Sequence, residues 1–172
     1  TLPIMLKSLI SNTRRHQFFN LLIFYSAFLW FRIFSSSVLG PYFLEQAVSL
    51  KQMILGNAWF FLTGSLWLVI IKTYSSRTAW WQAIVLSIIA ILVVVRVDNL
   101  WQYYWYWILL GLGNVLFFIP YNIAHFRLTP SHRTSFSAGI MFSIFPVIAF
   151  VAPLLAGRLA EMSYLYIWYG SI

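Results

Sequence analysis

Charged side chains are scarce in this 172-residue sequence. Only 8% of the residues are Asp, Glu, Lys or Arg, three of them acidic, whereas 62% of the residues are hydrophobic. A soluble domain carries about 25% charged residues, which cover its surface. Composition therefore excludes a water-soluble fold and predicts an integral membrane protein.

Cysteine is absent altogether. This absence excludes disulfides, thiolate metal sites and cysteine nucleophiles. The three histidines, His16, His125 and His132, do not form a close metal-ligand set, and no Gly-x-Ser-x-Gly motif occurs. We therefore expect no metal, no cofactor and no enzymatic activity, with a polytopic membrane enzyme as a weaker alternative.

The charge that is present is mostly positive. The formal net charge is +8 and the isoelectric point is about 10.1. In a soluble protein this balance would suggest nucleic acid as a partner. The longest basic run here is only Arg14-Arg15, and there is no soluble domain to present it. The lipid bilayer is thus the expected partner, because cytoplasmic loops of membrane proteins are enriched in Lys and Arg.

Long apolar runs account for most of the chain. A helix needs about 20 apolar residues to cross the hydrocarbon core, and the runs are continuously apolar rather than alternating as in barrel strands. We predict an all-α, polytopic helix bundle with short joints and antiparallel neighbours. Its five full spans are Phe18–Leu39, Met53–Ile71, Trp80–Val97, Trp105–Phe126 and Phe136–Leu155, and Tyr164 opens a sixth. Gly40-Pro41 is expected to stop the first helix.

The distribution of charge over the joints predicts the orientation. The N-terminal segment, the second joint and the fourth joint carry basic residues and no acid, namely Lys7, Arg14, Arg15, Lys72, Arg77, Arg127 and Arg133. All three acids, Glu45, Asp98 and Glu161, occur in the other joints. The first side is therefore predicted to be cytoplasmic, in a plasma or inner membrane. Residues 1–17 would be a cytoplasmic segment, either an amphipathic surface helix or a frayed terminus, and residues 18–172 the bundle.

Arg32 is an isolated cation within the first span. A charge near the bilayer centre costs about 2.5 kcal/mol or considerably more. One interpretation is that Arg32 extends to the outer interface past Ser35 and Ser36. The other is that it faces a water-filled cavity and binds an anionic solute, or a carboxylate elsewhere in the protein. No carboxylate lies inside a predicted span.

The fourth span carries the other polar side chains. Asn114, Tyr121 and His125 share one helix face, and Asn122 lies beside them. Pro120 frees a backbone carbonyl near the middle of this helix, as in transporter helices that line a cavity. This face either lines a solute path or forms a hydrogen-bonded seam between helices. Asn57 in the second span is a weaker candidate of the same kind.

Small residues and prolines are concentrated in the fifth span. Gly139 and Ser143 are four residues apart, as are Ala152 and Ala156, which is the spacing that lets helix backbones approach closely. Pro146 and Pro153 are expected to kink this helix.

The order of these segments resembles one six-helix half of a major facilitator superfamily transporter. Gly111 and Gly113 match the glycine-rich turn of that family's fourth helix. Pro130 with "HRTSFSAG" matches the following joint, and "APLLAGRL", which contains Gly157, matches the end of the fifth. The resemblance covers nearly the whole chain from Phe18. It implies alternating access, a second six-helix half as partner, a small-molecule solute, and conformational roles for Arg77 and Arg133.

The chain also departs from that family's pattern. The joint between second and third helices usually reads G-x-x-x-D-R-x-G-R-R, but here it is "KTYSSRTAWW", which keeps only Arg77. Trp107 stands where first halves tend to carry an arginine. These departures favour the C-terminal half. They also leave open a non-transporting membrane scaffold or assembly subunit derived from such a half.

Overall fold

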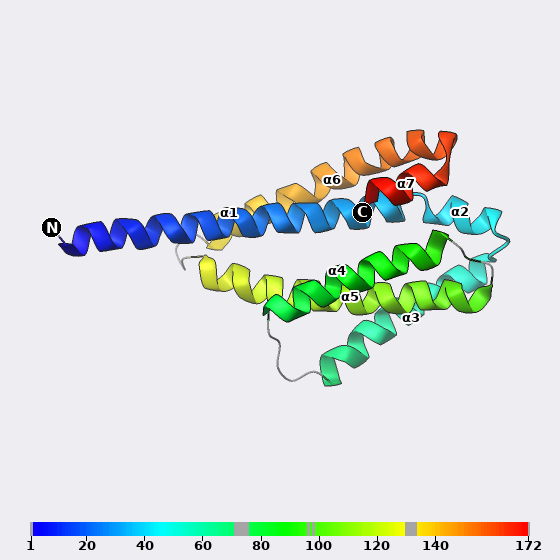
Figure 1. Cartoon of the computed structure of the whole chain (residues 1–172), viewed down its shortest axis with the longest axis horizontal. Coiled ribbons are helices and arrows are strands. Elements are labelled where there is room, and N and C mark those ends of the chain that lie inside the picture. The colour runs from blue at the N-terminus through cyan, green and yellow to red at the C-terminus, as the bar shows by residue number, and fades with distance from the viewer. Residues whose placement is uncertain (1, 71–75, 96, 98, 130–133, 172) are drawn as a thin grey trace.

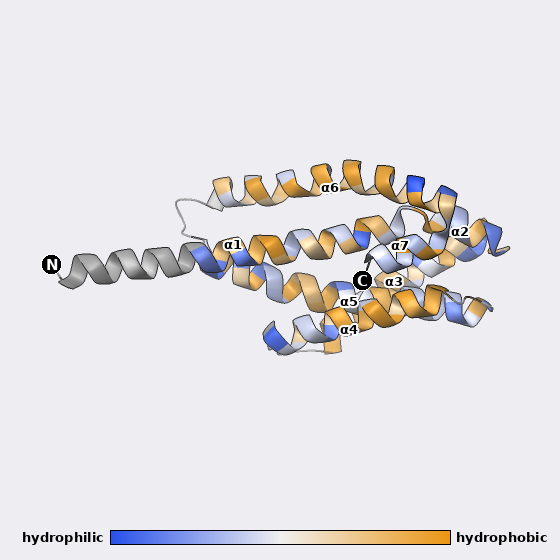
Figure 2. Cartoon of the chain, turned by 45° about the horizontal axis from the view of Figure 1, so that its top comes forward, coloured by the Kyte–Doolittle hydropathy of each residue, from blue (hydrophilic) through white to orange (hydrophobic). Residues whose placement is uncertain are grey.

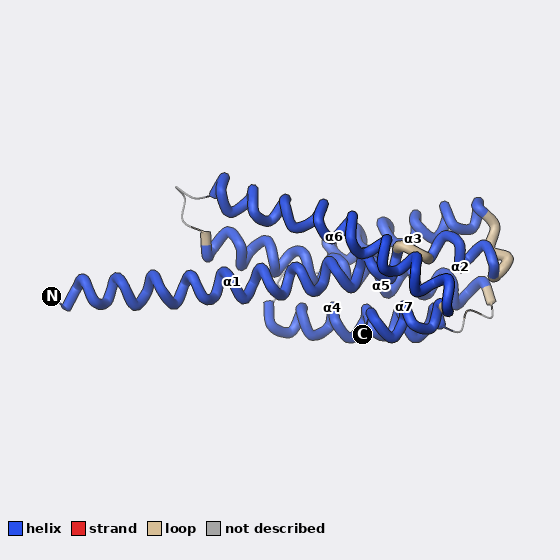
Figure 3. Tube along the Cα trace, turned by 90° about the horizontal axis from the view of Figure 1, so that it is seen from above, coloured by secondary structure: helices blue, strands red, loops and turns tan. Residues whose placement is uncertain are grey.

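The protein folds into a bundle of helices without strands over the residues that its computed structural model describes, which are 2–70, 76–95, 97, 99–129 and 134–171 (Figures 1 and 3). Side chains are described from His16 onward, except those of residues 76, 134 and 171. The helices are α1 (Leu2–Ser36), α2 (Leu39–Glu45), α3 (Leu50–Ile70), α4 (Ser76–Val95), α5 (Leu100–Leu128), α6 (Thr134–Met162) and α7 (Tyr164–Ser171).

Five segments are long and apolar enough to cross a membrane, as the sequence predicts. They are His16–Glu45, Leu50–Ile70, Arg77–Val95, Leu100–Leu128 and Ser135–Met162. The chain is therefore an all-α, multi-pass membrane protein. Figure 2 shows that apolar residues cover most of the length of α4 and α6, whose hydrophilic residues gather mainly near the helix ends.

Helix caps explain why α3 and α5 begin earlier than predicted. Asn99 precedes α5, and its side chain accepts a hydrogen bond from the backbone N–H of Gln102 at 3.0 Å. Ser49 and Gln52 form a reciprocal capping box before α3, with the Ser49 N–H donating to Gln52 Oε1 at 2.7 Å. Such caps satisfy N–H groups that a helix start leaves without partners. These polar residues therefore lengthen the helices rather than end them.

The joint after the first span differs from the prediction. α1 ends at Ser36, before Gly40-Pro41, and these two residues lie in the first turn of α2 instead of stopping a helix. Proline is tolerated there because the first N–H groups of a helix have no intrahelical partner. Tyr42 and Phe43 of α2 are buried, and the Tyr42 hydroxyl donates to the Val94 carbonyl at 2.9 Å. The hydroxyl bond ties α2 to α4, while the Tyr42 ring packs against α7 and the Phe43 ring against α5.

The helix α1 continues without a break through residue 17, where we expected the cytoplasmic segment to end and the bundle to begin. α1 runs from Leu2 to Ser36, so the segment assigned to the cytoplasm and the first span belong to one element. The side chains of Lys7, Arg14 and Arg15 lie outside the described residues, and so does their expected amphipathic pattern.

The helix ends are segregated along the long axis of the bundle. The N-terminus of α1, the end of α5 and the start of α6 lie at one end, on the left in Figure 1. Glu45 and Tyr164 lie at the opposite end, where the Tyr164 hydroxyl donates to the Glu45 carboxylate at 2.8 Å. The fold thus separates Arg77 and Arg127, at the start of α4 and the end of α5, from Glu45 and Glu161 at the opposite end.

The contacts between helices follow a two-fold pattern. The first unit consists of α1, α3 and α4, and the second of α5, α6 and α7, paired in that order. The contact of α1 with α6 then corresponds to that of α5 with α3, and the contact of α1 with α7 to that of α5 with α4. The α1–α5 and α4–α7 contacts each join two paired helices, so each corresponds to itself. All six contacts are observed. The match is one of contact identity and not of extent, since the α4–α5 contact is far larger than α1–α7. The α6–α7 contact, between helices joined by Ser163, has no counterpart as extensive among the described residues. Because successive spans alternate in direction, the two three-helix units are inverted relative to each other (Figure 1).

Helix α5 makes its closest contacts at two glycines. A Cβ at Gly111 would collide with the Phe60 carbonyl oxygen of α3. A Cβ at Gly113 would lie 3.1 Å from Ser87 Oγ and 3.3 Å from the Ala83 carbonyl oxygen of α4. The two glycines thus let α5 approach the backbones of two helices at once, which is the packing that small residues permit in membranes.

We expect Gly111→Ala to destabilise the fold, because the added methyl group forces α3 and α5 apart. Overpacking of this kind costs about 1–3 kcal/mol. Thermal unfolding in detergent measures the effect. Gly139→Ala is the matched control, since a Cβ at Gly139 would meet nothing within 4 Å. Equal melting temperatures for the two variants would contradict this role of Gly111.

Candidate functional site

The seam between α1 and α5 is built from stacked rings. Phe28 and Phe117 lie face to face with centroids 3.6 Å apart, and Tyr25 stacks on Tyr121 at 4.6 Å. Nearer the basic end, the rings of Phe18 and His125 are 5.8 Å apart. Aromatic contacts of this kind add about 0.5–1.5 kcal/mol each to the burial of the rings. The seam is a packed ladder along most of its length.

Arg32 lies one helical turn beyond Phe28, towards the end that carries Glu45. Its Cζ is 5.3 Å from the centroid of the Phe60 ring on α3, which is a cation–π distance. The phenol of Tyr106 on α5 is close enough to interact with it electrostatically. Nη1 of Arg32 is buried and has no hydrogen-bond partner among the described residues. Among the described residues, the guanidinium group therefore lies between α1, α3 and α5 without a carboxylate, and Arg32 as a whole is half-buried.

A buried guanidinium normally carries a compensating anion or several acceptors, since burial of an unpaired charge costs several kcal/mol. A cation–π contact returns only about 0.5–2 kcal/mol. The described carboxylates, Glu45 and Glu161, are exposed. Arg32 is thus the strongest candidate for binding an anion.

The remaining polar candidates do not gather around Arg32. Asn114 is half-buried on α5, whereas Asn122 is exposed on the other side of that helix. Asn57 is exposed on α3 and donates to its own helix, at the Met53 carbonyl, over 3.1 Å. The expected polar face of the fourth span is therefore reduced to Asn114, Tyr121 and His125. Of these, Tyr121 is fully buried, with a hydroxyl that has no partner within the described part of the chain.

His125 belongs to a buried polar cluster at the basic end. Its Nε2 is 2.9 Å from Ser137 Oγ, which is 3.1 Å from Thr129 Oγ1. His125 and Ser137 are each 4% exposed. The cluster joins α5 to α6, two helices that otherwise share few contacts. Ser137 and Thr129 were not expected from the sequence, although they flank the fourth joint closely enough for the chain reversal to bring them together.

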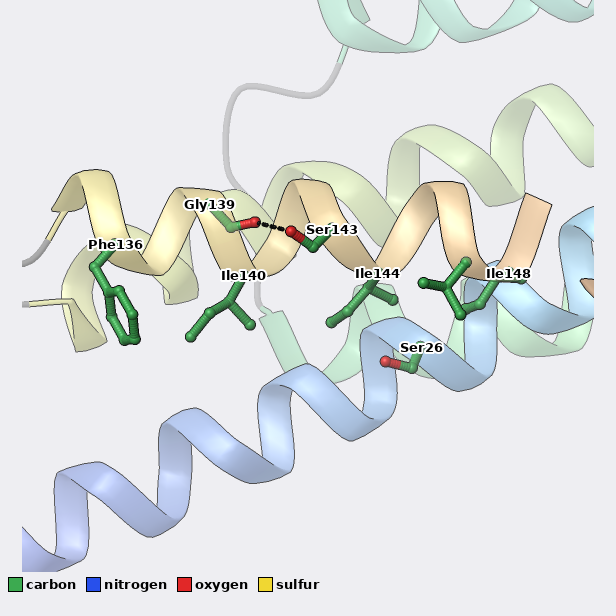
Figure 4. Close-up of a pocket in the computed structure, with 8 residues that line it drawn as sticks. Ser26, Phe136, Gly139, Ile140, Ser143, Ile144 and Ile148 are labelled. Atoms are coloured by element: carbon green, nitrogen blue, oxygen red, sulfur yellow. Dashed lines mark hydrogen bonds between the residues drawn. The ribbon is translucent and has the colours of Figure 1, made fainter. Parts of the chain in front are cut away.

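The small residues of α6 divide into two groups. Ala152 and Ala156 are completely buried, as close packing requires. Gly139 and Ser143, expected to pack in the same way, instead line an apolar groove of about 670 Å³ between α1 and α6, together with Ser26 and Ile140 (Figure 4). The Ser143 hydroxyl donates to the Gly139 carbonyl at 2.8 Å, so its hydrogen is used within α6 and only its oxygen can accept from the groove. Three further residues, Pro146, Pro153 and Gly157, lie on exposed positions of α6, and Pro120 is buried in α5.

The two arginines expected to act in conformational change are only partly described. Arg77 is exposed in the first turn of α4 and borders a second groove, between α1, α4 and α5. Arg133 lies outside the described residues. Among those described, no group of three His, Asp or Glu side chains could hold a metal ion.

The fold and these contacts define a multi-pass helical membrane protein with a half-buried arginine between three of its helices. No family model, curated protein or solved structure matches the chain.

Ser137→Ala removes the hydrogen bond between α5 and α6. We expect a loss of stability of about 0.6 kcal/mol, and at most about 1.7, as for other hydrogen bonds between membrane helices. Denaturation in mixed micelles measures it. Ser143→Ala, on the same helix but bonded within it, is expected to leave stability unchanged. A larger loss for Ser143→Ala than for Ser137→Ala would contradict this account.

Proposed function

We propose that the chain is part of a secondary transporter that moves a small polar, anionic solute by alternating access. The observation that carries the proposal is the inverted two-fold contact pattern of α1, α3 and α4 against α5, α6 and α7. Many secondary transporters are built from inverted repeats, and their substrate sites lie near the bilayer midplane at the repeat interface. In this chain α1 and α5, the first helices of the two units, meet at the seam of stacked rings, which is one of the contacts between the units.

Arg32 supports an anionic substrate. It borders the repeat interface, roughly two-thirds of the way along the first span, and its buried Nη1 has a free donor position among the described residues. A carboxylate or phosphate ester would supply the missing acceptor, and charge-assisted bonds to Arg are about twice as strong as neutral ones. Asn114 is a further candidate donor on the α5 side of the seam, whereas Tyr121 lies beyond the Phe28–Phe117 stack, next to Tyr25.

The rest of the proposed machinery follows from the resemblance to a major facilitator superfamily half. A second six-helix half would complete the path, facing α1 and α5, and this chain would be the C-terminal half. The proposed location is the plasma or inner membrane, with the basic end in the cytoplasm.

Arg32 can be tested by ligand-induced stabilisation of the purified protein. We expect a panel of small carboxylates and phosphate esters to raise the melting temperature, and their neutral amide or alcohol analogues not to do so. A ligand at 100 times its dissociation constant adds about 2.7 kcal/mol to stability. In Arg32→Gln the shift should disappear, and in Arg32→Lys it should be reduced.

The unliganded variants supply the control for folding. Arg32→Met should be at least as stable as the wild type, because it removes a charge whose Nη1 is buried without a partner among the described residues, and retains an apolar stem. Stable Arg32 variants that bind every anion as the wild type does would exclude Arg32 from the site. A wild type that responds to no anion would contradict the anionic substrate.

The proposed orientation is testable because the chain has no native cysteine. His16 and Gln46 are exposed at opposite ends of the bundle. In intact cells, a membrane-impermeant maleimide should label Gln46→Cys, and should label His16→Cys only after permeabilisation. Labelling in the reverse order would place the basic end outside.

A further inference from the structure

A groove of about 530 Å³ lies between α1, α4 and α5, near the basic end of the bundle. This volume is within the range of about 300–1,000 Å³ that small organic ligands occupy in proteins. The walls are mainly apolar, and include Leu21 and Phe24 of α1, Ile84 of α4, and Ala124 and Leu128 of α5. The groove is separate from Arg32, which lies beyond the Phe28–Phe117 stack.

The polar side chains of this groove are at one end. Gln17 and Asn20 of α1 and Arg77 of α4 are all exposed and lie nearer the basic helix ends than Phe24 and Ile84 do. Arg77 is also in the first turn of α4, where the helix dipole favours an anion. The groove therefore combines a cationic, hydrogen-bonding mouth with an apolar interior.

Two tryptophans mark the level of this mouth in the membrane. Trp80 and Trp81 line the groove, and Trp81 is 62% exposed. Trp80 Nε1 donates to the Phe117 carbonyl at 3.4 Å, which fixes its ring between α4 and α5. Tryptophan is enriched where hydrocarbon meets lipid headgroups. We therefore expect the Arg77 end of the groove to lie at headgroup level and its apolar part to lie level with the acyl chains.

We propose that this groove binds an anionic phospholipid of the cytoplasmic leaflet. Arg77, Gln17 and Asn20 hold the phosphate and the headgroup, and one acyl chain lies along Phe24 and Ile84. Charge complementarity supports this occupant, because Glu45 and Glu161, the described acids, are at the opposite end of the bundle and leave the mouth purely cationic. Basic pockets between membrane helices on the cytoplasmic side are typical sites for such headgroups. The site is independent of the transported solute.

Lipid titration of the delipidated protein in a neutral detergent tests the proposal. The probes are dioleoyl phosphatidylglycerol, dioleoyl phosphatidylcholine and inorganic phosphate, and the readouts are melting temperature and native mass spectrometry. We expect phosphatidylglycerol to bind more tightly than phosphatidylcholine and to raise the melting temperature further. Arg77→Gln should weaken phosphatidylglycerol binding about fivefold, since a basic residue near a headgroup contributes roughly that factor.

Arg158→Gln is the matched control, because it removes the same charge from an exposed position at the far end of α6. It should leave phosphatidylglycerol binding unchanged. A photoreactive phosphatidylglycerol should cross-link to α1, α4 or α5 along the groove in the wild type, and less so in Arg77→Gln.

Three outcomes would overturn the proposal. Equal binding of the two phospholipids would show that the groove does not recognise charge. If Arg77→Gln and Arg158→Gln weakened phosphatidylglycerol binding equally, the lipid would be attracted by the overall charge of the protein and not by a specific site. If inorganic phosphate alone raised the melting temperature as much as phosphatidylglycerol does, the mouth of the groove would be a site for a small soluble anion.

Discussion

The close packing of α5 against three other helices is the constraint on which this bundle depends. Gly111 and Gly113 allow contact with the backbones of α3 and α4, and the rings of Phe117 and Tyr121 fill the wider gap to α1. Inside a membrane there is little hydrophobic driving force between helices, so such contacts must supply the specificity. A helix with small residues on two faces and aromatic residues on the third meets this requirement. The two-fold contact pattern follows from the central positions of α5 and α1.

The same packing explains how a cation can be kept in the core. The Phe28–Phe117 stack closes the seam on one side of Arg32, and Phe60 covers the guanidinium from α3. The surrounding rings hold the charge in place without neutralising it. Such an arrangement lowers stability relative to an apolar side chain of similar size.

Prediction from sequence was most successful where hydropathy alone decides the structure. The five spans and their alternating directions follow from run length and short joints, because backbone hydrogen bonds must be satisfied within the helix in lipid. Prediction was weaker where the same local motif is compatible with two different structures. Gly40-Pro41 starts α2 instead of stopping α1, and Gly139 borders a groove although its spacing to Ser143 suits close packing. In both cases the neighbouring helix, and not the local motif, makes the difference.

The sequence by itself determined the class, the number of spans and the separation of charge between the two ends, because each depends on composition and order along the chain. Only the tertiary structure decided which polar residues meet. It placed Arg32 beside Phe60 and Tyr106, joined His125 to Ser137, and left Asn57 and Asn122 exposed. The physical reason is that helical periodicity assigns a residue to a face, whereas the rotation and crossing of packed helices determine what that face contacts.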